Sequence, residues 1–127
     1  MATTELTTNN FESTLQSNDI VLIDFWAEWC GPCRMFGPVF EKVSEAYPDV
    51  VFGKIDTEAQ QQIAASFNIM SIPTLMIVRE QVIVFSQAGA MPEASLVDLV
   101  EQVKALDMPA IHADIAAARA ERETSAD

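Results

Sequence analysis

The sequence predicts an α/β domain in which helices cover both faces of a mixed central β-sheet, followed by a short appended C-terminal helix. The first observation behind this prediction is that apolar runs of strand length alternate with segments of helical spacing, as in parallel strands joined by helices. The second is that the last two strand-like runs, 74–80 and 82–89, are separated by a single residue. That gap leaves no room for a crossover helix, so these strands must form an antiparallel hairpin.

The first elements can be assigned from the spacing of their apolar residues. Residues 1–19 are polar, and Phe11 and Leu15, four positions apart, indicate a first helix after a short opening strand. Residues 20–27 (IVLIDFWA) are apolar on both alternating faces except at Asp24. This pattern predicts a central strand that is covered on two sides.

Helices and strands alternate through the rest of the domain. A long amphipathic helix extends from Cys33 to Pro48. Residues 50–56 (VVFGKID) predict a strand, and residues 59–69 (AQQQIAASFNI) predict a helix. One more helix follows Pro92, with apolar positions at Leu96, Leu99, Val100 and Val103. The turn between the two hairpin strands lacks an Asn-Gly signal, so the sequence leaves its geometry open.

Residues 107–127 differ in kind from the rest of the chain, because they are rich in alanine and in charged residues. Met108, Ile111 and Ile115 form a thin apolar stripe, which predicts a short helix with a frayed end. The stripe is compatible with docking on the domain, with joining two subunits, or with neither. His112 is interpreted as a surface residue of this helix, since no cysteine lies near it in the sequence.

The composition narrows the functional classes. Nineteen acidic residues against seven basic ones give a formal net charge of -12, which repels phosphate backbones and anionic lipids. We therefore expect neither nucleic acid nor a membrane as a partner, although the charge can equally serve solubility alone. The chain starts without the basic segment of a signal peptide, and no apolar run approaches the ~18 residues of a membrane span. A soluble, cytoplasmic and monomeric protein is the expectation.

The two cysteines of the chain lie three positions apart, in the segment WCGPC at residues 29–33. At this separation they cannot join distant parts of a fold, so their role is chemical. Cys30 falls where a helix begins, and free backbone N–H groups and the positive end of the helix dipole therefore stabilise a thiolate there. An exposed Cys30 thiolate can attack a disulfide, and Cys33, one turn further on and more sheltered, can attack the resulting mixed disulfide.

Two other interpretations of the cysteine pair stay open. A structural zinc site needs about four ligands, and the chain offers two cysteines and a distant His112. No metal is therefore expected. Two buried structural cysteines fit poorly with the Gly31-Pro32 turn between them and with the polar side chains of Glu28 and Arg34 nearby. Thiol-disulfide chemistry is favoured over both.

Four motifs, in order along the chain, carry a family resemblance. DFWAEWCGPCRMFGP at 24–38, GKID at 53–56, SIPT at 71–74 and AGA at 88–90 together resemble thioredoxin. The resemblance runs from about residue 5 to residue 106. It implies a thioredoxin-like fold, which agrees with the fold predicted from periodicity, and it divides the chain into a thioredoxin domain at 1–106 and a C-terminal extension at 107–127.

The resemblance also implies roles for residues outside the cysteine pair. Asp24 is a lone carboxylate in an apolar strand, and we expect it to assist the deprotonation of Cys33. Lys54 either pairs with Asp24 across neighbouring strands or extends its ammonium group to solvent. The Ile72-Pro73 bond resembles the family's cis peptide opposite the cysteines, which would leave the backbone of Ile72 open to an extended substrate strand.

An uncharged substrate-binding surface is expected around Cys30. It consists of Trp29, Gly31, Pro32, Ile72, Pro73 and Gly89. Trp26 is interpreted as core packing beneath the site rather than as a contact residue. The plainer alternatives, a buried Asp24 with only a structural role and an ordinary proline at a strand entry, stay open.

These observations predict a thiol-disulfide oxidoreductase that reduces disulfide bonds in client proteins through Cys30 and Cys33. The resemblance implies that thioredoxin reductase, a flavin enzyme that uses NADPH, restores the dithiol. We expect no bound cofactor besides the redox-active Cys30–Cys33 disulfide, and the chain has no Gly-x-Gly-x-x-Gly nucleotide motif. An oxidase or isomerase is the alternative within the same chemistry, and a binding module with incidental thiols is the alternative outside it.

Overall fold

A five-stranded mixed β-sheet forms the centre of the computed structural model, which describes residues 2–125. The strands are β1 (Thr3–Glu5), β2 (Ile20–Trp26), β3 (Val51–Asp56), β4 (Thr74–Arg79) and β5 (Val82–Ala88), in the spatial order β1-β3-β2-β4-β5. β1, β3 and β2 run parallel, whereas β4 runs antiparallel to β2, and β5 runs antiparallel to β4. This topology confirms the predicted mixed sheet and its hairpin.

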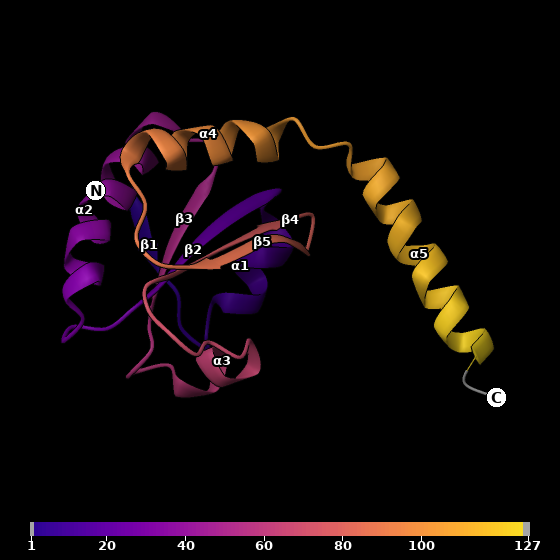
Figure 1. Ribbon diagram of the computed structural model, residues 1–127, viewed down its shortest axis with the longest axis horizontal. Helices are drawn as coiled ribbons and strands as arrows, with labels where there is room; N and C mark the ends of the chain where they lie inside the picture. The colour runs from indigo at the N-terminus through magenta and orange to yellow at the C-terminus, as the bar shows by residue number, and fades with distance from the viewer. Residues whose placement is uncertain (1, 126–127) are drawn as a thin grey trace.

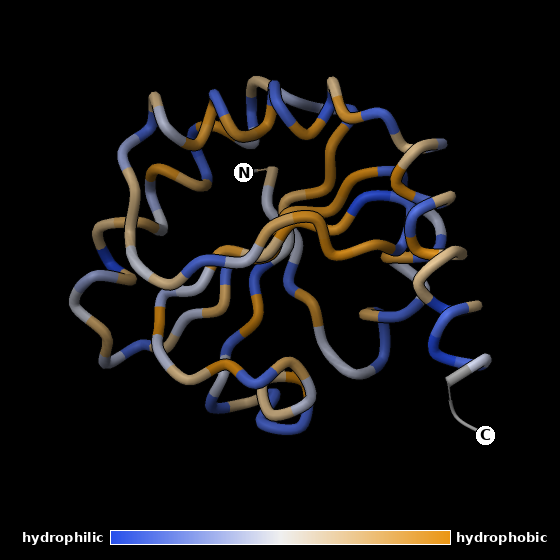
Figure 2. The backbone as a smooth tube through the Cα atoms, turned by 45° about the vertical axis from the view of Figure 1, so that its right-hand side comes forward, coloured by the Kyte–Doolittle hydropathy of each residue, from blue (hydrophilic) through white to orange (hydrophobic). Residues whose placement is uncertain are grey.

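Helices cover both faces of the sheet, and one further helix extends beyond it (Figure 1). The helices of the described residues are α1 (Phe11–Ser17), α2 (Gly31–Ala46), α3 (Gln61–Ser66), α4 (Glu93–Lys104) and α5 (Met108–Ser125). Successive side chains of β2 point to opposite faces: Leu22 packs with Phe40 and Leu96 from α2 and α4, whereas Val21 packs with Ile63 from α3. Figure 2 shows these apolar strands gathered at the centre of the molecule, with helices of mixed hydropathy around them.

α3 is shorter than the sequence predicts. We expected a helix over 59–69, and the structure forms only Gln61–Ser66. Before the helix, the Asp56 carboxylate accepts the backbone N–H of Glu58 at 2.9 Å, which holds the chain in a turn. After the helix, Asn68 has a φ of 56°, a left-handed backbone that ends it. Hydrophobic spacing reports neither of these local effects, so the predicted ends were wrong although the helix itself is confirmed.

The turn between β4 and β5 uses two residues with left-handed backbones. Glu80 has a φ of 50° and Gln81 a φ of 64°, the signs that a two-residue type I′ hairpin turn requires. Neighbouring segments hold this turn, because the N–H of Glu80 donates to the carbonyl oxygen of Asp19 at 2.8 Å, and the Glu80 carboxylate lies 2.8 Å from a ring nitrogen of His112. Contacts from distant parts of the chain thus stabilise a turn that its own residues do not favour.

Replacing Gln81 by Gly is expected to raise the free energy of unfolding by about 0.5 to 1 kcal/mol, because glycine adopts a positive φ without the steric cost of a Cβ atom. Urea denaturation followed by circular dichroism measures the change. The matched control is Gln87→Gly in β5, where the backbone is not left-handed, and there glycine should lower stability by a similar amount. Loss of stability in both variants would contradict this explanation of the turn.

The first turns of α5 attach it to the hairpin end of the sheet, and its later turns project into solvent (Figure 1). Met108 is buried, and His112 lies on the surface against Glu80. The predicted appended helix is therefore confirmed, and it runs for 18 residues. Residues 126 and 127, where we expected a frayed end, lie outside the described residues.

Arg79 fixes the connection between α4 and α5. Its Nη1 donates to the carbonyl oxygens of Val103 at 2.7 Å and of Lys104 and Leu106 at 3.2 Å, at the C-terminal end of α4 and just beyond it. Its Nε lies 3.6 Å from the Asp19 carboxylate. One arginine at the end of β4 thus ties the end of α4 to the loop before β2.

Candidate active site

The two cysteines lie at the N-terminal end of α2 and form a disulfide, with their Cα atoms 5.2 Å apart. Cys30 is the N-cap residue, and its Sγ accepts the backbone N–H of Cys33 at 3.2 Å. Pro32 occupies the first turn, where a missing N–H removes no helical hydrogen bond. The sulfur of Cys30 therefore faces free amide groups and the positive end of a 16-residue helix.

Cys30 is more buried than the sequence analysis predicted. We expected an exposed sulfur, and the side chain is only 4% exposed. Ala27 and Cys33 pack against it, with Trp26 and Ile72 beside them. The prediction was wrong because it considered only the start of the helix, whereas the carbonyl oxygen of Ile72, from a loop on the other side, lies 3.7 Å from Sγ. Cys33 is 5% exposed, so the disulfide form does not show the expected difference in shelter either.

Asp24 lies in β2 beneath α2. Asp24 is two residues after Leu22, so its side chain points to the same face of β2, the face that packs against α2 and α4. Its side chain is fully buried, and neither carboxylate oxygen has a hydrogen-bond partner among the described residues. Burial raises the pKa of Asp24 from 3.8 to about 7, and the nearby charge of Lys54 acts in the opposite direction. A carboxyl group that titrates near neutral pH therefore lies under the helix that carries both cysteines.

Lys54 stands next to Asp24 in the sheet without forming a close ion pair. The two residues are register partners on β3 and β2, but no contact within 4.0 Å joins their charged groups in the described structure. The Lys54 ammonium instead lies 5.3 Å from the centre of the Trp26 ring. Of the two predicted alternatives, a direct pair is therefore absent, while the charge of Lys54 still lowers the pKa of Asp24.

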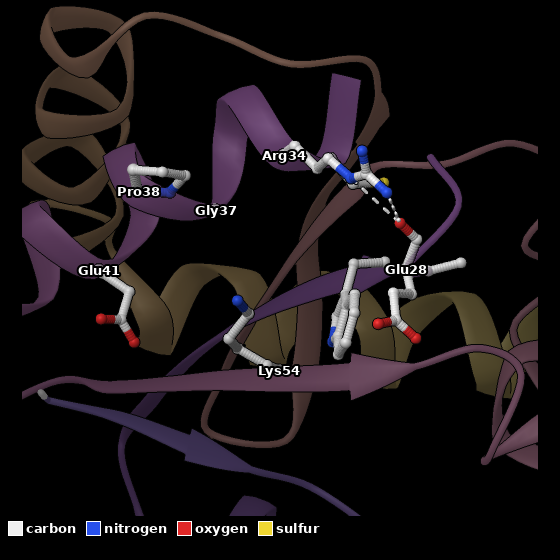
Figure 3. A pocket seen from close by; sticks show the side chains of 9 residues that line it. Glu28, Arg34, Gly37, Pro38, Glu41 and Lys54 are labelled. Carbon is white, nitrogen blue, oxygen red and sulfur yellow. Dashed lines mark hydrogen bonds between the residues drawn. The ribbon is translucent and has the colours of Figure 1, made fainter. Parts of the chain in front are cut away.

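A hollow of about 590 Å³ opens beside Cys33, between α2 and β3, and we call it the Cys33 hollow (Figure 3). Its lining includes Trp26, Cys33, Gly37, Pro38, Glu41 and Lys54. At one side Arg34 donates from its guanidinium group to the backbone oxygen of Glu28 at 3.0 and 3.2 Å. The Cys33 hollow gives solvent a route to the second cysteine and to Lys54. Trp26, interpreted from the sequence as core packing, both packs on the cysteines and lines this route.

The loops that carry the SIPT and AGA motifs lie beside the cysteines. The Ile72-Pro73 peptide bond is cis. Gly89 donates its N–H to the carbonyl oxygen of Pro73 at 2.8 Å and has a φ of 105°, a conformation that favours glycine. Together with the contact of Ile72 to Cys30, this brings Ile72, Pro73 and Gly89 to one side of the disulfide.

Trp29, Gly31 and Pro32 are exposed on the same side of the molecule as the disulfide they flank. The Trp29 side chain is 68% exposed, and its Nε1 donates to the Glu58 carboxylate at 2.8 Å. This contact of Glu58 could not be predicted from the sequence, because the two residues are 29 positions apart. Two exposed methionines, Met35 on α2 and Met70 in the loop before β4, could not be predicted either, since an exposed apolar residue cannot be distinguished from a core residue by spacing alone.

Within residues 2–125, no group of three or more His, Cys, Asp or Glu side chains is placed to hold a metal ion. His112 lies at the β4–β5 turn, whereas the cysteines lie beside the residues that precede β4. In the same described part of the chain, no helix combines the length and the apolar character that crossing a membrane requires.

Comparison with known proteins identifies the family. The thioredoxin family model matches residues 2–102. The chain belongs to the thioredoxin family. A protein of Streptomyces coelicolor provisionally named thioredoxin 2 is 59% identical over 120 residues, which cover 94% of this chain and 90% of the relative. Thioredoxin C-3 of Corynebacterium nephridii is 44% identical over 99 residues, covering 77% of this chain and 68% of the relative.

Solved thioredoxin structures share the fold. A thioredoxin variant from Halobacterium salinarum superposes with a TM-score of 0.74 at 33% identity, covering 80% of this chain and 90% of that structure. The thioredoxin of Malassezia sympodialis gives a TM-score of 0.72 at 35% identity, with 79% of this chain and 89% of that structure covered. The thioredoxin-like fold expected from the four motifs is therefore confirmed.

Family membership and the Cys30–Cys33 disulfide together establish the class of activity. This thioredoxin-family protein is a thiol-disulfide oxidoreductase, as the sequence predicted. The alignment with the relative from Streptomyces coelicolor covers 94% of this chain, so it continues past residue 102, where the match to the family model ends.

Proposed function

We propose that this thioredoxin-family protein reduces disulfide bonds of client proteins in the cytoplasm, with Cys30 as the nucleophile. The observation that carries the proposal is the position of the Cys30 sulfur, which accepts a backbone N–H at the N-terminal end of α2. This hydrogen bond and the helix dipole favour a thiolate at that position. Because the thiolate is the form that attacks disulfides, Cys30 begins the reaction once the pair is reduced.

The proposed reaction has two steps. In the first, the Cys30 thiolate attacks one sulfur of the client disulfide, forms a mixed disulfide with it and releases the other client sulfur as a thiolate. In the second, Cys33 loses its proton and attacks Sγ of Cys30, which closes the Cys30–Cys33 bond and releases the second client thiolate. The client thiolates take up protons from water. One client disulfide becomes two thiols, while two thiols of this chain become one disulfide.

Asp24 is proposed to accept the proton of Cys33 in the second step. A carboxyl group whose pKa is raised to about 7 by burial can both take and return a proton near neutral pH. Asp24 shares the face of β2 that packs on α2, the helix that carries Cys33. We propose that water in the Cys33 hollow carries the proton between the two groups, and that the charge of Lys54 adjusts the proton affinity of Asp24.

Client proteins are proposed to bind on the surface around Cys30. It consists of Trp29, Gly31, Pro32, Ile72, Pro73 and Gly89. These residues carry no charge, which suits transient contact with many partners. In this proposal the backbone of Ile72 pairs with an extended segment of the client, which holds the client disulfide in line with the Cys30 sulfur.

Thioredoxin reductase, a flavin enzyme that draws electrons from NADPH, is the proposed partner that returns the Cys30–Cys33 disulfide to the dithiol. Family membership supports this partner. The chain itself is proposed to act as a monomer without a bound cofactor. Residues 1–106 are proposed to form the catalytic thioredoxin domain, and residues 107–127 a C-terminal extension.

Replacing Cys33 by Ser tests the proposal, because this variant keeps the nucleophile but lacks the resolving thiol. We expect it to accumulate mixed disulfides between Cys30 and client proteins, which non-reducing gels separate and mass spectrometry identifies. The matched control, Cys30→Ser, should capture none. Equal capture by both variants would contradict the assigned roles, and no capture by Cys33→Ser would contradict the function. A strongly oxidising reduction potential of the wild-type pair would instead favour the oxidase alternative.

A further inference from the structure

The loop at 27–30 joins β2 to α2, and it carries the proposed nucleophile. Cys30 is its last residue and the N-cap of α2. Within the loop, the backbone N–H of Cys30 donates to the carbonyl oxygen of Ala27 at 3.2 Å. In the disulfide form, the bond to Cys33 adds a covalent tie to the helix. Reduction breaks that bond, so other contacts must then hold the Cys30 sulfur in place.

Arg34 supplies such contacts from the first turn of α2. Its Nη2 and Nε donate to the carbonyl oxygen of Glu28 at 3.0 and 3.2 Å (Figure 3). Its backbone N–H donates to the carbonyl oxygen of Cys30 at 3.3 Å. The side chain and the backbone of one residue thus hold the loop at two positions, on either side of Trp29. Neither contact involves a sulfur atom, so neither depends on the disulfide bond.

The contact between the Arg34 side chain and Glu28 depends on the shape of the guanidinium group, and we call it the Arg34 clamp. A guanidinium group carries its N–H donors in one rigid plane, so two of them can point to the same oxygen. A lysine ammonium group has the same charge, but its donors diverge from a single nitrogen at the end of a flexible chain. Lysine at this position would therefore keep the charge and lose the two-donor contact.

The charge of Arg34 is the other property that could act on Cys30. The titratable and charged groups around the cysteine pair are Asp24 of β2, Glu28 of the loop, Arg34 and Glu41 of α2, Lys54 and Asp56 of β3, and Glu58 after β3. The loops at 71–73 and 88–90 contribute no charged residue. Carboxyl groups therefore outnumber cations here. The Arg34 side chain is also exposed, and water screens an exposed charge. We therefore expect the contact geometry to matter more than the charge.

We infer that Arg34 is a positioning residue for Cys30: by holding the Glu28 carbonyl group, it keeps the Cys30 sulfur on the backbone N–H of Cys33 while the disulfide is open. The inference rests on the proposed function, and it assigns a residue to the preparation of the nucleophile. Without the Arg34 clamp the loop moves more, so the sulfur spends less time against the amide that stabilises its thiolate. The expected result is a smaller thiolate fraction at neutral pH.

The Cys33→Ser variant provides the background for the test, because it leaves Cys30 as the only thiol of the chain. The Cys30 thiolate displaces iodide from iodoacetamide and forms a thioether, so the alkylation rate across a pH series follows the thiolate fraction. Adding Arg34→Gln should raise the pH of half-maximal rate by about 0.5, which makes the reaction about 3-fold slower below that pH. Adding Arg34→Lys instead should give most of the same change, since lysine restores only the charge.

Lys42→Gln in the same background is the matched control. It removes one positive charge from the same helix, but Lys42 forms an ion pair with Glu93 and does not touch the loop. The pH profile of this variant should equal that of Cys33→Ser alone. An unchanged profile in Arg34→Lys would overturn the inference, because the charge alone would then be sufficient. An unchanged profile in Arg34→Gln would overturn it as well.

Hydrogen exchange of the Cys33 backbone N–H, followed by NMR, separates positioning from a general loosening of the helix. This N–H donates to the Cys30 sulfur. In Arg34→Lys with both cysteines present, we expect its exchange to be about 5-fold faster in the dithiol form and less than about 2-fold faster in the disulfide form, where the S–S bond keeps the sulfur in place. Equal acceleration in both forms would overturn the inference. Neither measurement uses a client protein, so a Cys33→Ser variant that captures no client would contradict the proposed function alone.

Discussion

Replacing Asp24 by Asn is expected to raise the free energy of unfolding by about 4 kcal/mol at about pH 8. Burial without a hydrogen-bond partner raises the pKa of Asp24 from 3.8 to about 7. Each unit of this rise corresponds to about 1.4 kcal/mol by which folding disfavours the charged carboxylate. Asparagine has nearly the same shape and never carries the charge, so the variant avoids this cost.

The sign of the effect depends on pH. Because the folded protein holds the Asp24 proton more tightly than the unfolded chain does, stability from this group falls as pH rises from about 4 to about 7. Below that window the carboxyl group is neutral in both states, and it contributes no penalty. Above the window it is charged in both states, and the penalty is complete. The stabilisation by Asp24→Asn should therefore disappear at about pH 4.

Urea denaturation of the disulfide form at a series of pH values measures this difference. The matched control is Asp114→Asn, which removes a carboxylate from the exposed face of α5 and should change stability little at any pH. If the free energies of unfolding of Asp24→Asn and wild type differed by the same amount from acid to alkaline pH, burial of the Asp24 charge would not be the cause of the difference. The same variant should slow the second chemical step, because Cys33 would lose its proposed proton acceptor.

Replacing Phe40 by Ala is expected to lower the free energy of unfolding by about 4 kcal/mol. Phe40 is fully buried between α2 and the sheet. Its ring centre lies 5.1 Å from that of Phe52 in an edge-to-face arrangement and 5.8 Å from that of Phe36. Removing the ring leaves a cavity at the point where α2 is held on β3, and it also removes both aromatic contacts.

Thermal or urea unfolding of Phe40→Ala measures this loss. Met35→Ala is the control on the same helix, because its side chain is exposed and its removal creates no cavity. A change of less than about 1 kcal/mol in Phe40→Ala would contradict the core arrangement between α2 and β3. Similar losses in both variants would point to helix propensity rather than core packing.

The helices and strands that pack on the core could be predicted from the sequence, because their buried side chains must be apolar and therefore recur at a regular spacing. The alternation of Val21 and Leu22 between the two faces is visible as an unbroken apolar run, and the short gap between 74–80 and 82–89 determines the hairpin. The hairpin turn could not be predicted. Glu80 and Gln81 take left-handed backbones because Asp19 and His112 hold them from elsewhere in the chain.

The same distinction holds for the candidate active site: features set by a single helix or strand could be predicted from the sequence, whereas features set by contacts between distant segments could not. The position of Cys30 at the start of α2 and the burial of Asp24 could be predicted, because they follow from the start of one helix and the apolar pattern of one strand. The cover over Cys30 and the exposure of Met70 depend on how the loop before β4 meets the end of β2. No spacing rule describes such a meeting of distant segments.

The anchoring of α5 has a practical consequence. Arg79 and Glu80 hold the start of α5 at the far end of β4 from Pro73, and β4 is six residues long, which separates the two ends by about 20 Å. The outer turns of α5 are therefore a suitable attachment site for a label or a surface. A dye, bead or electrode linker placed on them would leave the opposite pole, with its sulfur pair, free to meet proteins in solution.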